Sequence, residues 1–142
     1  MVSPRELSQI KQKLEGQAFE AGDLDAYLKI FADYFNNHPE GQEYIKHFRV
    51  FISFTVKNGE DFWLKFYKGD CDFGFGEAQD NLFQKIFKYY VEIPVKALIQ
   101  LILGENKDEI AKKESIACYF ESEKLRRVLN TFQMVSRYIS TV

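Results

Sequence analysis

The chain has 142 residues, of which 46% are hydrophobic and 28% are charged. This balance is typical of globular proteins and excludes intrinsic disorder, while the net charge of −2 excludes a general electrostatic attraction to nucleic acids or anionic membranes. The unusual feature is the aromatic content of 16%, which is more than a small core requires. The length predicts a single domain over residues 1–142, with residues 1–22 as an N-terminal helical extension.

The sequence lacks the features of an exported or membrane-spanning protein. The first residues contain no apolar run of the kind found in signal peptides, and no apolar segment is long enough to cross a bilayer. Cys71 and Cys118 form neither a disulfide framework nor a metal-ligand spacing. We therefore expect a cytoplasmic protein with reduced thiols, no stable membrane insertion and no metal or cofactor.

Three helices are predicted before the first strand. Ser3 and Glu6 have the spacing of a capping box, and Pro4 occupies the first helical position. A second helix follows Gly22 and ends near residue 37, and a short third helix covers residues 39–47. The second helix carries one continuous apolar stripe with helical spacing, made of Leu24, Tyr27, Leu28, Phe31, Tyr34 and Phe35.

The hydrophobic period then changes from helical to two, which predicts strands. The first three strands cover residues 48–56, 62–67 and 71–76 and form an antiparallel meander. The dipeptide Asn58–Gly59 predicts a type I′ hairpin turn between the first two strands, because such a turn needs a positive φ at both central positions. A fourth strand is predicted over residues 86–93.

The C-terminal third combines helices with a fifth predicted strand. Pro94 opens a helix that stops at Gly104, and a charged, solvated helix follows it. The fifth strand is predicted from Ile116, Cys118 and Phe120, which face one side. Ser122 caps the last helix, whose apolar stripe is Leu125, Val128, Leu129, Phe132, Val135 and Ile139. The predicted fold class is α+β, with a five-stranded, mostly antiparallel sheet covered by helices.

Candidate catalytic and metal sites are weak in this sequence. His38 and His47 belong to no metal-binding motif, and the two cysteines lie on apolar strand faces, where they behave as small hydrophobic residues. The segment around Gly74 lacks the third glycine of a phosphate-binding loop. Its bare backbone instead predicts a bulge or a close contact with a neighbouring group, either a ligand or the protein itself.

Charged residues leave two further alternatives open. Asp70, Asp72 or Glu92 would act as a general base if one of them lay in an apolar cavity, and otherwise they are turn or surface residues. The basic residues of the last helix form either a solvated face or a docking patch for anionic lipid headgroups. They are Lys124, Arg126, Arg127 and Arg137.

The helix after Pro94 is the most informative predicted element. Its apolar residues surround the axis on nearly every side, and only Lys96 and Gln100 form a polar strip. A helix at the surface needs only one apolar stripe. This helix is therefore covered on a second side by another layer of the protein, by a partner chain or by an apolar ligand.

The order and spacing of several segments resemble the sterol carrier protein 2 family of lipid-binding domains. The matching segments are residues 27–32 before Asn37 and Pro39, the hairpin 51–59 answered by 62–64 and 68–69, residues 95–98 leading to 103–105, and the segment 116–121. The resemblance implies a five-stranded sheet covered by helices that enclose an apolar tunnel. It also implies a ligand such as a sterol, a fatty acid or an acyl chain.

We therefore expect non-catalytic binding or carriage of an apolar small molecule between the sheet and the helices. The predicted lining residues are Phe54, Trp63, Phe75, Leu98, Ile102, Val128 and Phe132. One alternative is an interaction module or homodimer whose exposed aromatic residues Phe51, Trp63 and Tyr67 form an interface over a self-filled core. A further alternative is a cofactor-free isomerase or hydrolase that uses the carboxylates named above.

Overall fold

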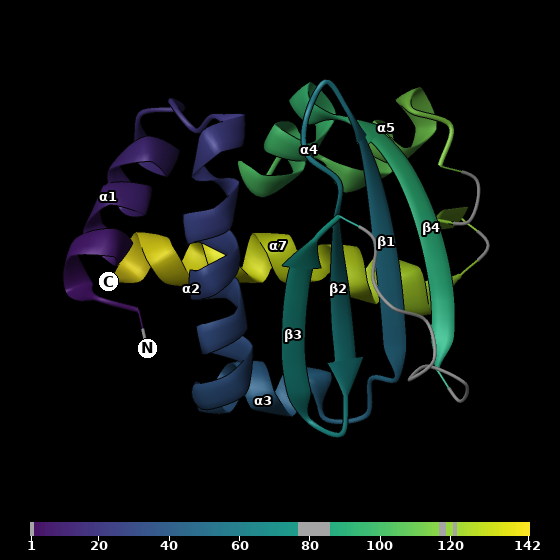
Figure 1. The fold of residues 1–142 in the computed structure, drawn as a ribbon, viewed down its shortest axis with the longest axis horizontal. Coiled ribbons are helices and arrows are strands. Elements are labelled where there is room, and N and C mark those ends of the chain that lie inside the picture. Colours follow the sequence, from purple (N-terminus) through teal and green to yellow (C-terminus); the bar gives the residue numbers. More distant parts are fainter. Residues whose placement is uncertain (1, 77–85, 117–118, 121) are drawn as a thin grey trace.

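The computed structural model describes residues 2–76, 86–116, 119–120 and 122–142. In this part of the chain a four-stranded sheet is backed by helices, and the longest helix crosses behind the strands (Figure 1). We call the sheet face toward this helix the inner face, and the opposite one the outer face. The α+β class is correct.

The N-terminal helices begin where their capping residues predict. Helix α1 spans Pro4–Glu15, and the Ser3 hydroxyl oxygen accepts a hydrogen bond of 3.2 Å from the N–H of Glu6. A short 3₁₀ turn, η1 (Ala21–Asp23), leads into α2 (Leu24–Asn37). The predicted apolar stripe of α2 is fully buried. Helix α3 covers Pro39–Ile45 and is slightly shorter than predicted.

The sheet is mixed and has the strand order β3-β2-β1-β4. Strands β1 (Val50–Lys57), β2 (Phe62–Tyr67) and β3 (Asp70–Phe75) form the predicted antiparallel meander. Strand β4 (Phe87–Pro94) pairs with β1 in parallel along its whole length. The prediction of five mostly antiparallel strands is therefore wrong, because the described residues form four strands and β4 pairs in parallel with β1.

The predicted fifth strand is also wrong. Residues 119–120 are helical, and the N–H of Tyr119 donates to the carbonyl of Ile116 at 3.1 Å, which is a turn contact. Ile116 and Tyr119 are both buried and lie three residues apart, whereas Phe120 is 53% exposed, so the burial follows a helical period. The Arg126 guanidinium donates to the carbonyls of Tyr119 and Phe120. Cys118 lies outside the described residues.

The turn with positive φ at both central residues lies in the second hairpin and not in the first. Asn58 has a φ of +64° but Gly59 has none in the positive range, so the β1–β2 connection is not a type I′ turn. It is a longer loop, in which the Asp61 carboxylate accepts the N–H of Val56 at 2.8 Å. The β2–β3 connection instead has a positive φ at both central residues, Lys68 (+51°) and Gly69 (+79°). The two-residue turn therefore lies one hairpin later than the sequence signal predicts.

The C-terminal helices agree with the sequence at their ends. Helix α4 covers Val95–Ile102, and Gly104 follows it with a φ of +89°. Helix α5 covers Lys107–Lys113, and α7 covers Glu123–Thr141. The Ser122 hydroxyl caps α7 by accepting the N–H of Leu125 at 3.2 Å. Every residue of the predicted apolar stripe of α7 is buried.

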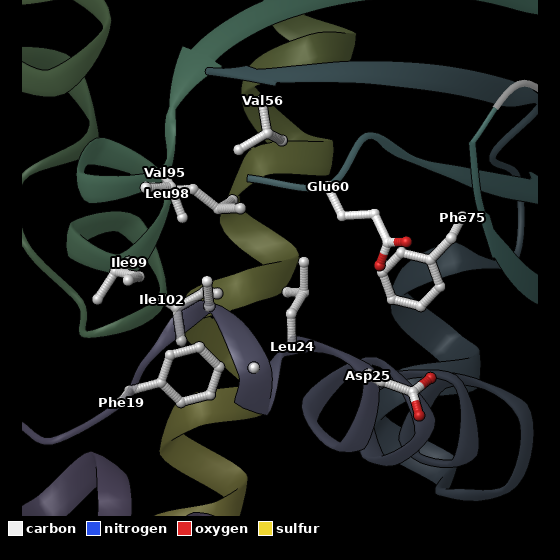
Figure 2. Close-up of a pocket in the computed structure, with 12 residues that line it drawn as sticks. Phe19, Leu24, Asp25, Val56, Glu60, Phe75, Val95, Leu98, Ile99 and Ile102 are labelled. Carbon is white, nitrogen blue, oxygen red and sulfur yellow. The ribbon is translucent and has the colours of Figure 1, made fainter. Parts of the chain in front are cut away.

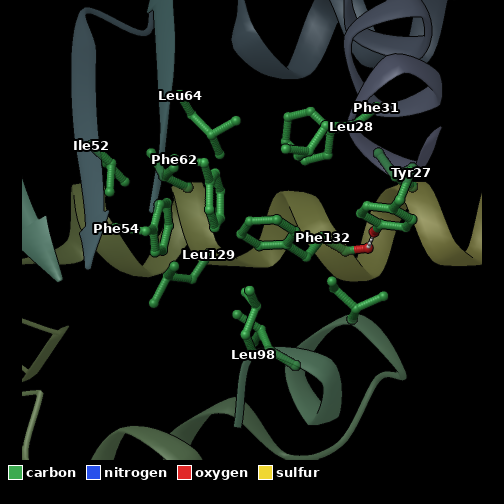
Figure 3. Close-up of a cluster of buried hydrophobic side chains, with 14 of the residues drawn as sticks. Tyr27, Leu28, Phe31, Ile52, Phe54, Phe62, Leu64, Leu98, Leu129 and Phe132 are labelled. Atoms are coloured by element: carbon green, nitrogen blue, oxygen red, sulfur yellow. Dashed lines mark hydrogen bonds between the residues drawn. The ribbon is translucent and has the colours of Figure 1, made fainter. Parts of the chain in front are cut away.

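An aromatic cluster fills the centre of the core between the sheet, α2 and α7 (Figure 3). The ring of Phe132 lies 5.3 Å from that of Phe31, 6.0 Å from that of Phe54 and 6.4 Å from that of Tyr27. The Tyr27 hydroxyl donates to the carbonyl of Phe132 at 2.7 Å, and its complete burial raises the pKa of this phenol. Part of the aromatic surplus in the composition is therefore packing.

The β3 edge of the sheet is closed by a side chain of α2. The Asn36 amide donates to the carbonyl of Cys71 at 2.9 Å and accepts the N–H of Cys71 at 2.7 Å, in the manner of a neighbouring strand. Cys71 is 5% exposed and belongs to the core cluster, so it is a packing residue, as the sequence predicts, and this burial raises the pKa of its thiol.

Candidate functional site

An apolar pocket of about 100 Å³ lies where the N-terminal segment, the sheet and α4 meet (Figure 2). Its walls come from four parts of the chain: the segment up to the start of α2, the end of β1 with its loop, the end of β3, and one side of α4. The apolar lining residues are Phe19, Ala21, Leu24, Val56, Phe75, Val95, Leu98, Ile99 and Ile102.

The N-terminal segment forms one wall of this pocket. Phe19 precedes η1, is only 5% exposed, and meets the ring of Tyr27 edge-on at 5.6 Å. Because Tyr27 is held by hydrogen bonds to α7, this contact fixes the position of Phe19. The segment 1–22 thus takes part in the core and in the pocket.

The loop between β1 and β2 forms a second wall through a close backbone approach. A Cβ added to Gly59 would lie 2.8 Å from a methyl of Val56 and 3.2 Å from a methyl of Val95. Any side chain at this position would therefore push both pocket residues. Gly59 is explained by this packing, and not by the turn conformation that the sequence predicts.

Two carboxylates lie at the rim of the pocket. Asp25 and Glu60 are exposed side chains among otherwise apolar lining residues (Figure 2). Asp25 also forms an ion pair of 3.3 Å with Lys29. An apolar interior with acidic groups at its mouth favours a ligand that has a hydrocarbon end and an uncharged or cationic head.

Three of the seven predicted lining residues meet in this pocket, namely Phe75, Leu98 and Ile102. Phe54, Val128 and Phe132 lie in the central core, where each is at most 1% exposed. There Phe54 stacks on Phe62 at 4.5 Å between ring centres. The structure therefore divides the predicted set between a pocket and a region that the protein fills with its own side chains.

The remaining predicted residue, Trp63, lies on the outer face of the sheet. Its indole covers Gly74, where an added Cβ would lie 2.6 Å from the ring, and its centre lies 5.8 Å from that of Phe51. The close contact predicted at Gly74 is therefore made by Trp63 of the neighbouring strand β2. Phe51 is 5% exposed and Tyr67 is half-buried, so the expected exposed aromatic interface is largely covered.

Several residues that line the pocket are not among the seven predicted from the sequence. Val95 and Ile99 belong to the helix whose unusual apolar surface was the informative signal, and that surface is what faces the pocket. Phe19 lies between two helices, where no periodicity indicates which way a side chain points. Asp25 and Glu60 carry no sequence signal, because their place at the rim depends on how the helix and the hairpin meet.

The carboxylates considered for catalysis are not brought together. Asp70 and Asp72 are exposed on the outer face of β3, whereas Glu92 is exposed on the same face of β4, at the opposite edge of the sheet. The Asp72 carboxylate accepts the N–H of Phe73 at 2.9 Å. None of the three lines the apolar pocket.

His38 and the basic residues Lys124 and Arg127 have contacts within the fold. The ring of His38 stacks on Tyr34 at 4.9 Å, and across the described ranges no group of three His, Cys, Asp or Glu residues is arranged to hold a metal ion. Lys124 lies 3.7 Å above the ring centre of Phe87, and Arg127 lies 4.9 Å from that of Phe48.

Within the described part of the chain, no helix has both the length and the apolar character needed to cross a bilayer. The chain matches no protein-family model, no curated protein and no solved structure with which it was compared. The site is therefore interpreted from its own geometry.

Proposed function

We propose that this protein binds an apolar small molecule without chemical conversion and holds one end of it in the pocket between Phe19, the sheet and α4. The observation that carries the proposal is the pocket itself, which is lined mainly by apolar side chains and whose two charged lining side chains are exposed. The resemblance to the sterol carrier protein 2 family supports the same ligand class. Burial of hydrocarbon would drive binding, at about 25 cal/mol per Å² of apolar surface.

The size of the pocket limits what enters it. An engineered protein cavity of about 150 Å³ holds a benzene molecule, and this pocket is smaller, at about 100 Å³. It therefore takes the end of a hydrocarbon chain, and the rest of a longer ligand lies outside. Phe75 and Ile99 line the pocket and are half-buried, so they would contact the part of the ligand that leaves the pocket.

The acidic rim selects among ligands with the same hydrocarbon end. A fatty acid would place its carboxylate near Glu60, where like charges repel, and near Asp25, whose charge is partly compensated by Lys29 at 3.3 Å. An alcohol or an amine avoids this repulsion. We therefore expect a straight-chain alcohol to bind more tightly than the fatty acid of equal length, and the difference to shrink at high salt.

Filling the pocket from α4 tests the proposal. In Ile99→Trp the larger side chain occupies the pocket, so we expect the affinity for 1-octanol, measured by titration calorimetry, to fall at least about tenfold. The matched control is Lys96→Trp, which adds the same ring to an exposed position of the same helix outside the pocket lining. Lys96→Trp should bind like the unmodified protein.

Equal affinities in the two variants, or no heat of binding for any alcohol from butanol to dodecanol, would refute the pocket as the ligand site. Circular dichroism and the thermal midpoint show whether each variant keeps the fold. Because Ile99 is only half-buried and borders the pocket, the larger ring can enter that space without displacing core side chains, and we expect Ile99→Trp to fold.

A further inference from the structure

Strand β4 lies at the end of the sheet, and among the described residues it pairs only with β1. The N–H of Phe87 donates to the carbonyl of Arg49 at 3.0 Å, which fixes which backbone groups of β4 face β1. In a parallel ladder, alternate residues direct both of their backbone groups to the same neighbour. The residues whose N–H and C=O point away from β1 are Lys88, Tyr90 and Glu92.

This edge differs from the opposite edge of the sheet. On β3, the Asn36 side chain satisfies both backbone groups of Cys71. On β4, two of the most exposed large hydrophobic side chains of the described chain lie on opposite faces of the same strand, Phe87 at 57% on the inner face and Tyr90 at 69% on the outer face. An exposed edge with apolar side chains is a template for pairing with another strand.

We propose that two copies of this chain pair antiparallel through β4, with a twofold axis at Tyr90. The side chains of Lys88, Tyr90 and Glu92 share the outer face of the sheet, next to Phe51, Ser53 and Thr55 of β1. In this register Lys88 lies opposite Glu92 of the second copy, and the symmetry repeats the pair on the other side of the axis. Tyr90 lies beside Tyr90 of the second copy, so the most exposed ring is covered.

The charges distinguish this register from its neighbours. Moving the axis by one residue, to Tyr89 or Val91, would place Tyr90 opposite Lys88 or Glu92 and lose both charge pairs. Moving it by two residues, to Lys88 or Glu92, would place two lysines or two glutamates opposite each other. Like charges directly opposite destabilise strand pairing. Lys88 takes part in another contact within the chain. Its ammonium has three donors, so it can bind Glu92 of the second copy as well.

Charge reversal tests the pairing directly. We expect the mass of the unmodified protein, measured by sedimentation equilibrium from about 1 µM to about 1 mM, to rise from that of the monomer to that of the dimer. Glu92→Lys should weaken the dimer at least about tenfold, because Lys88 of each copy then lies opposite a lysine of the other copy. The double reversal Lys88→Glu with Glu92→Lys should restore the affinity to within about threefold of the unmodified protein.

The matched control is Glu109→Lys, which makes the same charge change on the exposed surface of α5. A monomer at every concentration, a dimer indifferent to Glu92→Lys, or a double reversal that folds but stays monomeric would each overturn the proposal.

If the double reversal does not fold, Tyr90→Pro replaces it. Proline removes the outward N–H of an edge residue and spares the ladder to β1, so this variant should be monomeric. A dimeric Tyr90→Pro would overturn the pairing, whatever the outcome of the alcohol titrations.

Discussion

Replacing Phe132 with alanine should lower the free energy of unfolding by about 3–5 kcal/mol. The side chain is fully buried, and its ring contacts aromatic residues from α2 and β1. Alanine would leave a cavity at the point where the sheet and two helices meet, and surrounding rings held on three elements can fill it only in part. Urea denaturation followed by circular dichroism gives the difference.

Phe120→Ala is the matched control, because it removes the same side chain from a position that is 53% exposed. Its expected cost is below about 0.5 kcal/mol. A cost below about 1 kcal/mol for Phe132→Ala would contradict the packed core described above, since a fully buried aromatic ring contributes more than that.

Replacing Phe75 with alanine should increase the length of the hydrocarbon chain that the protein binds best. Phe75 is half-buried at the end of β3 and forms one side of the pocket, so removing its ring enlarges the space. Burial of each additional methylene contributes about 0.8 kcal/mol, which corresponds to an affinity gain of up to about fourfold. Calorimetry with alcohols of increasing length should therefore show the affinity rising over roughly two to four more methylenes than in the unmodified protein.

Phe73→Ala is the control for this experiment. Phe73 lies two residues away on the same inner face of β3, with its ring 6.2 Å from that of Phe75, but it does not line the pocket. Its chain-length preference should match that of the unmodified protein. The same preference in Phe75→Ala would show that the hydrocarbon end does not lie against Phe75.

The helices could be predicted because their signals are local. Ser3 and Ser122 are capping residues whose bonds lie within one turn, and the apolar stripes of α2 and α7 repeat over several turns. Alternation along β2 places Trp63 on the face opposite Phe62, as in the structure, and therefore away from the pocket that it was expected to line. Such signals require no knowledge of distant contacts.

The parallel pairing of β4 and the loss of the fifth strand depend on contacts that the sequence pattern does not contain. Around residue 118, alternation of Ile116 and Phe120 competes with the three-residue spacing of Ile116 and Tyr119, and the second pattern is the one that is buried. Arg126 then stabilises the non-strand conformation by binding the carbonyls of Tyr119 and Phe120.

The candidate site was only partly predictable for a related reason. The unusual apolar surface of α4 indicates that the helix is covered on more than one side. The sequence does not show which side packs against the core and which side faces a pocket. Leu98 and Ile102 face the pocket, whereas Phe132, chosen by the same reasoning, fills the core.

The most direct test of the proposed function is a titration with 1-octanol followed by the methyl resonances of isotope-labelled Ile, Leu and Val. We predict that the methyls of Val95, Leu98 and Ile99 shift in a saturable manner, while those of Leu129 and Ile139 in the core stay in place. Absence of saturable shifts at the pocket methyls, or shifts confined to the core, would contradict the proposal that an apolar ligand binds between Phe19, the sheet and α4.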